Sequence, residues 1–592
     1  MPYIELHAAS AFSFLRGASL PEALVARAAT LGYPALALLD ADGVYGAPRF
    51  HKAALKAGIK PIIGAELTVS MAPPAAGVSR EPRGASAETW LLPVLVENAH
   101  GYRNLCRLVT RMKLRAPKGH GALRLDELDG HTSGLVALVG HPVLNARRHG
   151  VGGLLDRLIG MFGRRQVYVE VQRHLLREQE SDNAALTSLA RAFRVPVLAT
   201  NGVRFAEPGD RALYDVLTCV HHHTTVDAAG RTLARNAERY LKSPDAMAAL
   251  FVDQPEALAA TRDLAERLEY TMADLGYRFP KYPVPEGETE ASFLRHVTDA
   301  GARDRYRPYH DRARAQIARE LDVIEKLELA GYFLIVWDIV NFCRRAHILV
   351  QGRGSAANSA VCYSLGITAV DPIAMDLLFE RFLSEERGEW PDIDLDLPSG
   401  ERRERVIQYV YDKYGPAGAA MTANVITYRS RSAAREVGKA LALQETQVDA
   451  LAKAMHNFEF VDPHDTLARN LAAAGLSLDA PRIRMFTELW LAIQDLPRHL
   501  GQHSGGMVIC QDALDTVVPL EPASMPGRVV IQWDKDDCAD MGIVKVDLLG
   551  LGMMAVLQDA IALINTSTRT PGTPPLELAR IPPDDPAVYD LL

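Results

Sequence analysis

The chain has 592 residues, of which 48% are hydrophobic and 23% charged, and its net charge is −8. This composition is typical of a globular protein with roughly three to five domains and sizeable cores. The negative charge argues against nucleic-acid binding through bulk charge, although a local basic groove stays possible.

The six cysteines are scattered and form no CxxC pair. This usage indicates a reducing cytoplasm and argues against a disulfide framework or a zinc site. The N-terminal residues show no signal-peptide pattern, and no apolar run approaches the ~20 residues of a membrane span. We therefore expect a cytoplasmic protein with no membrane partner.

The first part of the chain alternates short apolar runs with helical periodicity. Strands are expected at residues 3–6, 35–39 and 60–69, with helices at 21–31 and 50–57. This βαβαβ pattern predicts a parallel sheet or barrel. A Pro/Gly/Ser-rich loop is expected at 72–88, followed by strands near 90–96, 135–138, 167–171 and 195–200.

Polar residues follow these predicted strands, at the edge where functional side chains of such folds lie. They are His7, Asp40, Glu66, His141, Glu170, His174 and Asn201. They form a partial metal-ligand set, and a barrel with an ordinary polar rim remains an equal alternative. For the run His221–His223, a polar loop is favoured over a metal site.

A Pro-rich linker is expected at residues 278–290, and a long amphipathic helical region at 291–329. An apolar helix at 332–347 precedes a predicted strand, Gly-rich turn and helix over 348–359. In that turn Gly352 and Gly354 permit close backbone approach, while Arg353 and Ser355 offer donors to a phosphate. It is neither a P-loop nor a dinucleotide fingerprint, and a plain strand–helix turn is the alternative.

The run PDIDLDL at 391–397 alternates carboxylates with apolar residues. Alternation predicts a strand that carries Asp392, Asp394 and Asp396 on one face. Carboxylates this close repel one another unless a cation lies between them, which favours a divalent metal. The alternative is a solvated edge strand.

Two later segments supply further charges. Residues 427–439 predict a helix with Arg431, Arg435 and Lys439 on one face, suited to a phosphate backbone or to plain solvent exposure. A polar turn at 501–506 contains His503, and a strand at 542–550 places Lys545 beside Asp547. Next to the acidic strand, this pair would add a carboxylate and a phosphate-binding cation, which together suit two-metal nucleotidyl transfer.

These motifs, in order, resemble the palm of bacterial C-family DNA polymerases, the polymerase III alpha subunits and their error-prone relatives. The matching runs are GRGSAANS, DPIAMDLLFERFLSEER, PDIDLD, GQHSGGMVI, QWDKDD and VKVDLLGL. The resemblance implies that Asp392, Asp394 and Asp547 hold two Mg2+ ions as the catalytic triad, with Asp396 a less certain ligand. It also implies nucleotide binding by Arg353, Gly354, Ser355, Lys545, Arg435, Lys439 and His503.

The first domain resembles the PHP domain of the same polymerases, with departures at its metal ligands. His7, Asp40, Glu66 and His174 remain, but Ala9 and Ala41 stand where the pattern has histidines. Asn201-Gly-Val-Arg204 replaces the Asp-x-His near the domain's end, and no other side chain obviously takes the missing places. The resemblance implies a vestigial PHP site without metal or proofreading hydrolysis, as in the error-prone branch.

The implied fold is α/β and α+β multidomain, with a distorted β/α barrel and a polymerase-beta-like palm that carries an inserted helical thumb. The expected domains are PHP at 1–277, palm at 278–423 and 496–560, thumb at 424–495, and the start of truncated fingers at 561–592. The expected activity is error-prone, template-directed DNA synthesis in damage tolerance, on primer–template DNA with deoxynucleoside triphosphates. The sliding-clamp motif of the family is absent from this sequence. Alternatives are a replicative alpha-subunit-like polymerase, a PHP phosphoesterase or a non-catalytic interaction module.

Overall fold

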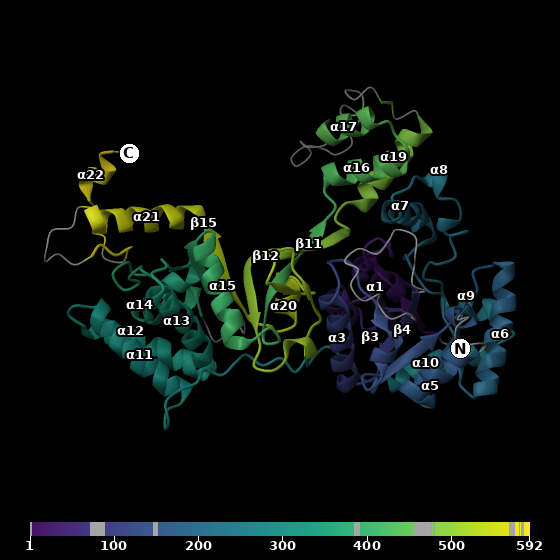
Figure 1. Ribbon diagram of the computed structural model, residues 1–592, viewed down its shortest axis with the longest axis horizontal. Coiled ribbons are helices and arrows are strands. Elements are labelled where there is room, and N and C mark those ends of the chain that lie inside the picture. The colour runs from purple at the N-terminus through teal and green to yellow at the C-terminus, as the bar shows by residue number, and fades with distance from the viewer. Residues whose placement is uncertain are drawn as a thin grey trace. The chain divides into compact units, whose positions relative to one another are not determined.

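The structure is a computed structural model that describes residues 3–70, 89–145, 152–383, 391–454, 471, 476–477, 480–567, 575–578, 581 and 585–591. These residues form two compact units, each assembled from separate stretches of chain (Figure 1). The first unit comprises residues 1–275, 423–501 and 515–541, and the second comprises 276–422, 502–514 and 542–592. The loop expected at 72–88 lies outside the described residues, as do parts of the expected thumb at 424–495 and of the expected start of fingers at 561–592.

The first unit contains an eight-stranded sheet in the order β1-β2-β3-β4-β6-β7-β8, with β5 paired to β3. The strands are β1 (Glu5–Ala8), β2 (Ala35–Ala41), β3 (Lys60–Ser70), β4 (Thr89–Val96), β5 (Leu123–Arg124), β6 (Leu135–Val139), β7 (Val167–Val171) and β8 (Val197–Ala199). Because β1, β2 and β3 are parallel, and so are β6, β7 and β8, the carboxyl ends of each set share one edge. That edge carries the polar residues singled out in the sequence.

The parallel pairing predicted for the first three strands is confirmed, whereas β4 pairs antiparallel with both β3 and β6. A parallel neighbour needs a crossover connection, usually a helix, and the Pro/Gly/Ser-rich run 72–88 has no helical periodicity. An antiparallel neighbour needs no such crossover, so the sheet is mixed.

Helices cover this sheet and bury its apolar side chains. They include α1 (Pro21–Thr30), α2 (Ala47–Lys56), α3 (Ala99–Leu114), α5 (Gly153–Phe162), α6 (Arg177–Phe193), α7 (Arg211–His221) and α10 (Pro255–Arg267). Leu264 of α10 joins Leu6, Leu39 and Leu138 of the strands in one buried cluster. His221 ends α7, so the loop predicted for residues 221–223 begins one residue later.

The first unit also contains α16 (Ser430–Ala440), α17 (Glu445–Ala454) and α19 (Pro481–Ile493). Val437 of α16 and the buried Phe486 and Trp490 of α19 share a hydrophobic cluster with Leu217 of α7. The basic helix predicted at 427–439 is therefore real but begins at Ser430, and its apolar face packs within this unit.

The second unit is built on the strand order β12-β15-β10-β9. These strands are β9 (Gln351–Arg353), β10 (Asp394–Pro398), β12 (Pro497–Ile509) and β15 (Lys545–Leu551). The pair β10–β15 is parallel, while β9 and residues 506–508 of β12 run antiparallel to their neighbours. The central strands β10 and β15 thus carry residues of the PDIDLDL run and of the Lys545–Asp547 segment, respectively.

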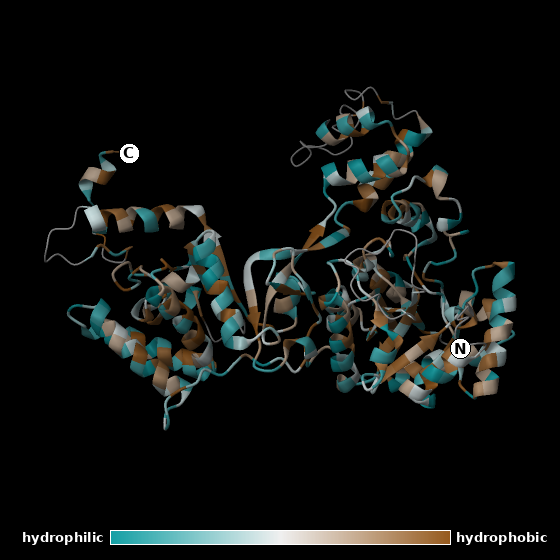
Figure 2. Cartoon of the chain, in the orientation of Figure 1, coloured by the Kyte–Doolittle hydropathy of each residue, from teal (hydrophilic) through white to brown (hydrophobic). Residues whose placement is uncertain are grey.

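The helices of this unit are α11 (Glu290–Arg305), α12 (Asp311–Lys326), α13 (Ala330–Arg345), α14 (Ala360–Leu365), α15 (Glu401–Tyr414) and α21 (Gly552–Ser567). In Figure 2, α15 is mostly hydrophilic, while α21 carries more hydrophobic residues. Val406, Ile407, Val410 and Tyr411 give α15 a single buried face. No helix within the described residues has the length and hydrophobicity needed to cross a membrane.

Three element predictions near the site need correction. The acidic strand begins at Asp394, so Asp392 lies just ahead of it. The strand before the Gly-rich turn is Gln351–Arg353, because Gly352 pairs with Leu395 of β10 instead of opening a turn. Residues 501–506 are not a turn: they lie within β12, whose pairing with β15 extends to Gly506.

The helical region predicted at 291–329 consists of two helices. The helix α11 ends at Arg305 and α12 starts at Asp311. Pro308 lies between them, and a proline removes a backbone donor and clashes with the preceding helical turn.

Candidate active site

Three carboxylates meet on the central strand pair of the second unit. Asp394 of β10 lies directly opposite Asp547 of β15, so the two side chains project from the same face of the sheet. Asp392 lies two residues before the first residue of β10, and the ligand oxygens of all three lie within 4.8 Å of one another. Among the described residues this is the only group of three or more His, Cys, Asp or Glu side chains that converges in this way.

The alternating sequence explains why the carboxylates point together. Ile393, Leu395 and Leu397 are fully buried on the opposite face and fix the orientation of the strand. The backbone N–H of Ile393 donates to the hydroxyl of Tyr332 on α13, 3.1 Å away. The helix thus holds the segment just ahead of the strand, where Asp392 lies.

The electrostatics of the cluster favour a bound cation. Burial, together with the neighbouring Asp547 and Asp392, raises the pKa of Asp394 to about 6. Lys545 Nζ lies 2.8 Å from Asp392 Oδ1 and 2.5 Å from Asp547 Oδ2, so one ammonium bridges two of the carboxylates. Asp547 Oδ1 is buried and has no hydrogen-bond partner among the described residues.

These features fit a hard divalent cation such as Mg2+. All the converging ligands are carboxylate oxygens, which Mg2+ prefers, and Asp392 is exposed enough for a substrate phosphate to reach the site. The unsatisfied oxygen of Asp547 offers a ligand that the surrounding residues do not use. Asp392, Asp394 and Asp547 are the residues that would hold the metal.

The Gly-rich turn approaches the same face. Arg353 pairs with Asp394 across β9 and β10, and its guanidinium lies 3.5 Å from Asp394 Oδ2 and 3.3 Å from Asp396 Oδ1. Half of the Arg353 side chain is exposed, so it has donors left for an anionic ligand. Gly354 and Ser355 follow in the 3-10 turn Gly354–Asn358. Asp396 is buried, pairs with Arg353 and is not one of the three carboxylates that converge.

His503 lies beside the cluster on β12. Its Nδ1 accepts hydrogen bonds from the backbone N–H groups of Gly505 and Gly506, at 3.2 and 2.7 Å, and lies 3.9 Å from Asp547 Oδ1. Gly506 is opposite Asp547, and a Cβ there would come within 2.2 Å of Thr422 Oγ1 and 3.0 Å of Asp547 Oδ1. The double glycine therefore lets β12 pass close to the carboxylate.

Two supporting residues were not identified from the sequence. Tyr332 holds the segment at Asp392, and Arg403 of α15 donates to the carbonyl of Leu548 at 2.7 Å and also to Ser504. Their partners are distant in the chain, and nothing in the local pattern around either residue indicates them.

Arg435 and Lys439 lie on α16, in the first unit, and their predicted nucleotide role stays a prediction. A hollow of about 460 Å3 is lined there by Arg429, Arg431, Ser432, Arg435, Glu436 and Arg498. The nearest acid to Arg435 in ion-pair range is Asp449, 3.8 Å away. The basic face thus has more cations than acids, as an anion-binding surface requires.

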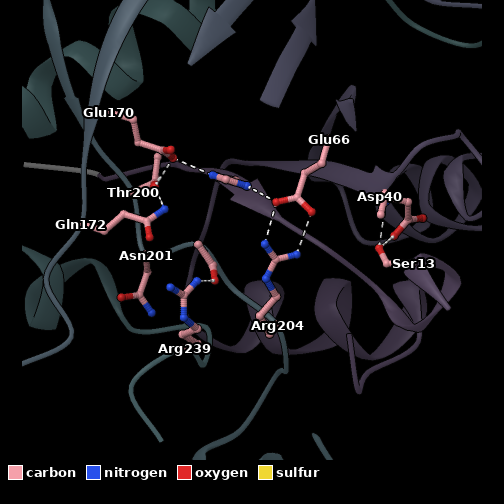
Figure 3. Close-up of polar contacts among 12 residues, drawn as sticks. Ser13, Asp40, Glu66, Glu170, Gln172, Thr200, Asn201, Arg204 and Arg239 are labelled. Atoms are coloured by element: carbon pink, nitrogen blue, oxygen red, sulfur yellow. Dashed lines mark hydrogen bonds and ion pairs between the residues drawn. The ribbon is translucent and has the colours of Figure 1, made fainter. Parts of the chain in front are cut away.

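The first unit contains a second polar cluster, at the edge of its sheet (Figure 3). His7 Nε2 lies 2.8 Å from Glu66 Oε1, and His7 Nδ1 lies 2.6 Å from Glu170 Oε1. Arg204 donates to both oxygens of Glu66, at 2.9 and 2.6 Å, and Thr200 donates to Glu170. The charges alternate along this chain of side chains and neutralise one another.

The pKa shifts agree with ionised partners. Burial alone would lower the pKa of His7, but Glu170 and Glu66 outweigh it and raise that pKa to about 10. For Glu66, burial alone would raise the pKa, but the charges and hydrogen bonds of Arg204 and His7 hold that pKa well below its usual range. A protonated His7 has no lone pair for a metal, since both nitrogens carry protons.

The other two predicted residues of the vestigial site are engaged elsewhere. Asp40 accepts hydrogen bonds from Ser10 and Ser13, and Figure 3 shows it apart from Glu66 and Glu170. His174 Nε2 lies 2.8 Å from the carbonyl of Asn201, and burial, with Arg239, lowers the pKa of His174 to about 3. These residues do not fit a metal centre. The guanidinium of Arg204 lies in the cluster beside Glu66, but as a cation without a free lone pair it does not replace a missing ligand.

Comparison with known proteins finds two matching domain families. The profile of the bacterial DNA polymerase III alpha NTPase domain matches residues 292–550, and that of the PHP domain matches residues 5–174. The chain therefore contains a bacterial DNA polymerase III alpha NTPase domain and a PHP domain, which confirms the resemblance and the multidomain α/β and α+β class.

Individual curated proteins are similar to this chain over its whole length. The chain is 42% identical to an error-prone DNA polymerase of Anaeromyxobacter dehalogenans, over 100% of this chain and 58% of that protein. It is 44% identical to an error-prone DNA polymerase of Mycolicibacterium paratuberculosis, over 100% and 53% respectively. The chain thus spans about half the length of these curated relatives. A solved amidohydrolase from Chromobacterium violaceum aligns with 34% of this chain and 88% of its own, at 18% identity and a TM-score of 0.22.

Proposed function

We propose that the second unit contains most of the catalytic palm of an error-prone, template-directed DNA polymerase that acts in damage tolerance. The observation that carries the proposal is the convergence of Asp392, Asp394 and Asp547 on one face of β10 and β15. The family and the similarity to error-prone DNA polymerases support the same reaction. Its substrates are primer–template DNA and deoxynucleoside triphosphates, and the sliding clamp and damage-tolerance proteins are the expected partners.

In this proposal the three aspartates hold two Mg2+ ions. The bound ions would activate the primer 3′-hydroxyl and stabilise the pyrophosphate that leaves. Lys545 then exchanges its carboxylate contacts for triphosphate oxygens, which its flexible stem permits. Arg353 and the backbone and hydroxyl of Ser355 bind the remaining phosphate charge, and Gly354 keeps their approach open.

The remaining parts take supporting roles. We assign residues 278–423 and 496–560 to the palm, 424–495 to a thumb, and 561–592 to the start of fingers. The basic face of α16, with Arg435 and Lys439, binds the DNA backbone, and His503 orients the nucleotide site from β12. The PHP domain at 1–277 binds no metal and does not proofread, because Arg204 neutralises Glu66 where a metal would bind.

Primer extension with the 592-residue chain and Mg2+ tests the proposal. Asp394→Asn should lower the rate by at least about 100-fold, since it removes a carboxylate from the reacting centre. Asp412→Asn, an exposed residue of α15, is the matched control and should leave the rate unchanged. Equal rates for Asp394→Asn and the wild type would disprove the site assignment. A wild-type chain without activity would favour the non-catalytic interaction module.

A further inference from the structure

Glu320 is a buried carboxylate next to the Gly-rich turn of the second unit. It lies on α12 and has no solvent-exposed surface. A buried charge is strongly unfavourable unless hydrogen bonds compensate it, so its surroundings must hold it firmly.

Four donors surround this carboxylate, two for each oxygen. Oε1 accepts from the backbone N–H of Ala360 at 3.0 Å and from Gln316 Nε2 at 2.9 Å. Oε2 accepts from Ser359 Oγ at 2.8 Å and from the backbone N–H of Val361 at 3.0 Å. Three of these donors belong to the first residues of α14 and its cap.

The contact completes the start of α14. The N–H groups in the first turn of a helix have no partner within the helix, and a negative charge there is favourable. Ser359 Oγ also accepts from the N–H of Cys362 at 3.1 Å, so the serine caps the helix while it donates to Glu320. Carboxylate and cap together fix the position of residue 359.

The Gly-rich turn lies between this anchor and the sheet. At one end, Arg353 of β9 pairs with Asp394 of β10, and the N–H of Gly352 donates to Ile367 at 2.6 Å. At the other end lies Ser359, held by Glu320. Inside the turn Asn358 Nδ2 donates to the carbonyl of Ser355 at 2.9 Å. Only the 3-10 residues Gly354–Asn358 separate the two fixed ends.

We propose that Glu320 is a positioning residue for the nucleotide site: it holds the turn so that Arg353 and Ser355 face the acidic cluster together. It acts through Ser359 and the start of α14 and contacts neither substrate nor metal. This role rests on the proposed polymerase function. It explains why a carboxylate lies at a buried position of α12 where packing alone would be served by an apolar side chain.

The Glu320→Gln variant tests the role with little change in shape. An amide has a single acceptor oxygen, and its NH2 group would face donors, so at least one backbone N–H at 360 or 361 loses its partner. The KM for the deoxynucleotide should rise about tenfold, while kcat changes much less. A loss confined to kcat would overturn the assignment to nucleotide positioning.

Glu325→Gln is the matched control. Glu325 lies on the same helix but is exposed and pairs with Arg295, and its replacement should leave both constants unchanged. Ser359→Ala removes one of the four donors and the helix cap with a smaller disturbance. It should raise KM in the same direction, and it replaces Glu320→Gln if that variant does not fold.

Hydrogen–deuterium exchange provides a measurement independent of catalysis. Amides 360–362 should exchange faster in Glu320→Gln than in the wild type, with exchange in β10 and β15 unchanged. Unchanged exchange at 360–362 would overturn the anchor, and faster exchange with an unchanged KM would overturn its role in nucleotide binding. A wild-type chain that incorporates no nucleotide would instead refute the polymerase proposal, and exchange would still decide whether Glu320 holds the turn.

Discussion

Arg204 donates to both carboxylate oxygens of Glu66, at N–O distances of 2.9 and 2.6 Å. The pair is buried, with 11% of the Arg204 side chain and 1% of the Glu66 side chain exposed. His7 links Glu66 to Glu170. The cation Arg204 is therefore part of a network that connects β1, β3 and β7, which lie far apart in the sequence. The guanidinium supplies there the positive charge that a metal ion would otherwise bring.

Removing this cation should destabilise the first unit. Arg204→Met leaves Glu66 buried with only His7 as partner, and breaking a buried pair from one side costs about 3–5 kcal/mol. Denaturant unfolding measures the loss. Arg235→Met removes an arginine from an exposed pair with Glu178 and should change stability by less than about 1 kcal/mol. Equal effects of the two variants would contradict the structural role of Arg204.

The same cluster predicts that the PHP domain purifies without metal. Metal analysis of the Asp394→Asn variant, in which the acidic cluster of the second unit is disabled, should find no stoichiometric zinc, manganese or iron. His7 is protonated on both nitrogens and Glu66 is fully engaged, so neither offers a free ligand. Stoichiometric metal in this variant would revive the phosphoesterase alternative.

Gly506 should be intolerant of a side chain. A Cβ at this position would meet Thr422 Oγ1 at 2.2 Å and press on Asp547 Oδ1 at 3.0 Å. Gly506→Ala should therefore destabilise by about 1–3 kcal/mol and displace a proposed catalytic carboxylate, which lowers the extension rate. Thr422→Ala in the same chain removes the closest contact and should restore part of both losses.

Gly552→Ala is the control for this substitution. A methyl group added at Gly552 would have no other atom within 4 Å, and the backbone there does not require glycine. The variant should behave like the wild type in unfolding and extension assays. Wild-type behaviour of Gly506→Ala would mean that β12 does not approach Asp547 as closely as the structure places it.

The acidic face was predictable because its information is local. A strand repeats every two residues, so the alternation in PDIDLDL indicates which side chains share a face before any partner is known. Burial of Ile393 and Leu395 confirms the apolar half of that pattern. The strand's first residue was not predictable, because the pairing with β9 and β15 begins at Asp394 and depends on both partners.

Contacts across long chain separations could not be predicted from the pattern. Arg204 and Glu66 are 138 residues apart, and Glu320 reaches Ser359 across 39. No periodicity relates such positions, and only the folded chain brings them together. The ligand losses at Ala9 and Ala41 indicated a vestigial site, but not which cation would neutralise the remaining carboxylates.

The pKa of Asp394 predicts how metal binding depends on pH. Burial and neighbouring carboxylates raise this pKa to about 6 in the metal-free protein. Protons therefore compete with Mg2+ below that value, and Mg2+ affinity should fall as the pH is lowered from 8 to 5. In the metal-free protein, the effect of pH on stability has the opposite sign. Because the pKa of Asp394 is raised in the folded state, this carboxyl group stabilises the fold at low pH, and that stabilisation is lost as the pH rises through about 6.

Thermal unfolding with and without Mg2+ at several pH values measures both effects. The stabilisation by Mg2+ should be large at pH 8 and small at pH 5, since ligand binding to the native state stabilises it by an amount that grows with the logarithm of the ligand concentration relative to Kd. Asp394→Asn should abolish most of this pH dependence. A Mg2+ effect that is equal at both pH values would show that Asp394 is not a ligand.

The basic face of α16 predicts a salt-dependent contribution to DNA binding. Each phosphate contact contributes about 0.9 to the slope of log K against log salt on duplex DNA. Replacing both Arg435 and Lys439 by alanine should therefore reduce that slope by up to about 2 for primer–template DNA. Arg482→Ala, on α19 and paired with Asp227, should leave the slope unchanged. If the double variant shows the wild-type slope of log K against log salt, α16 does not contact the DNA backbone, and its basic face is simply exposed to solvent.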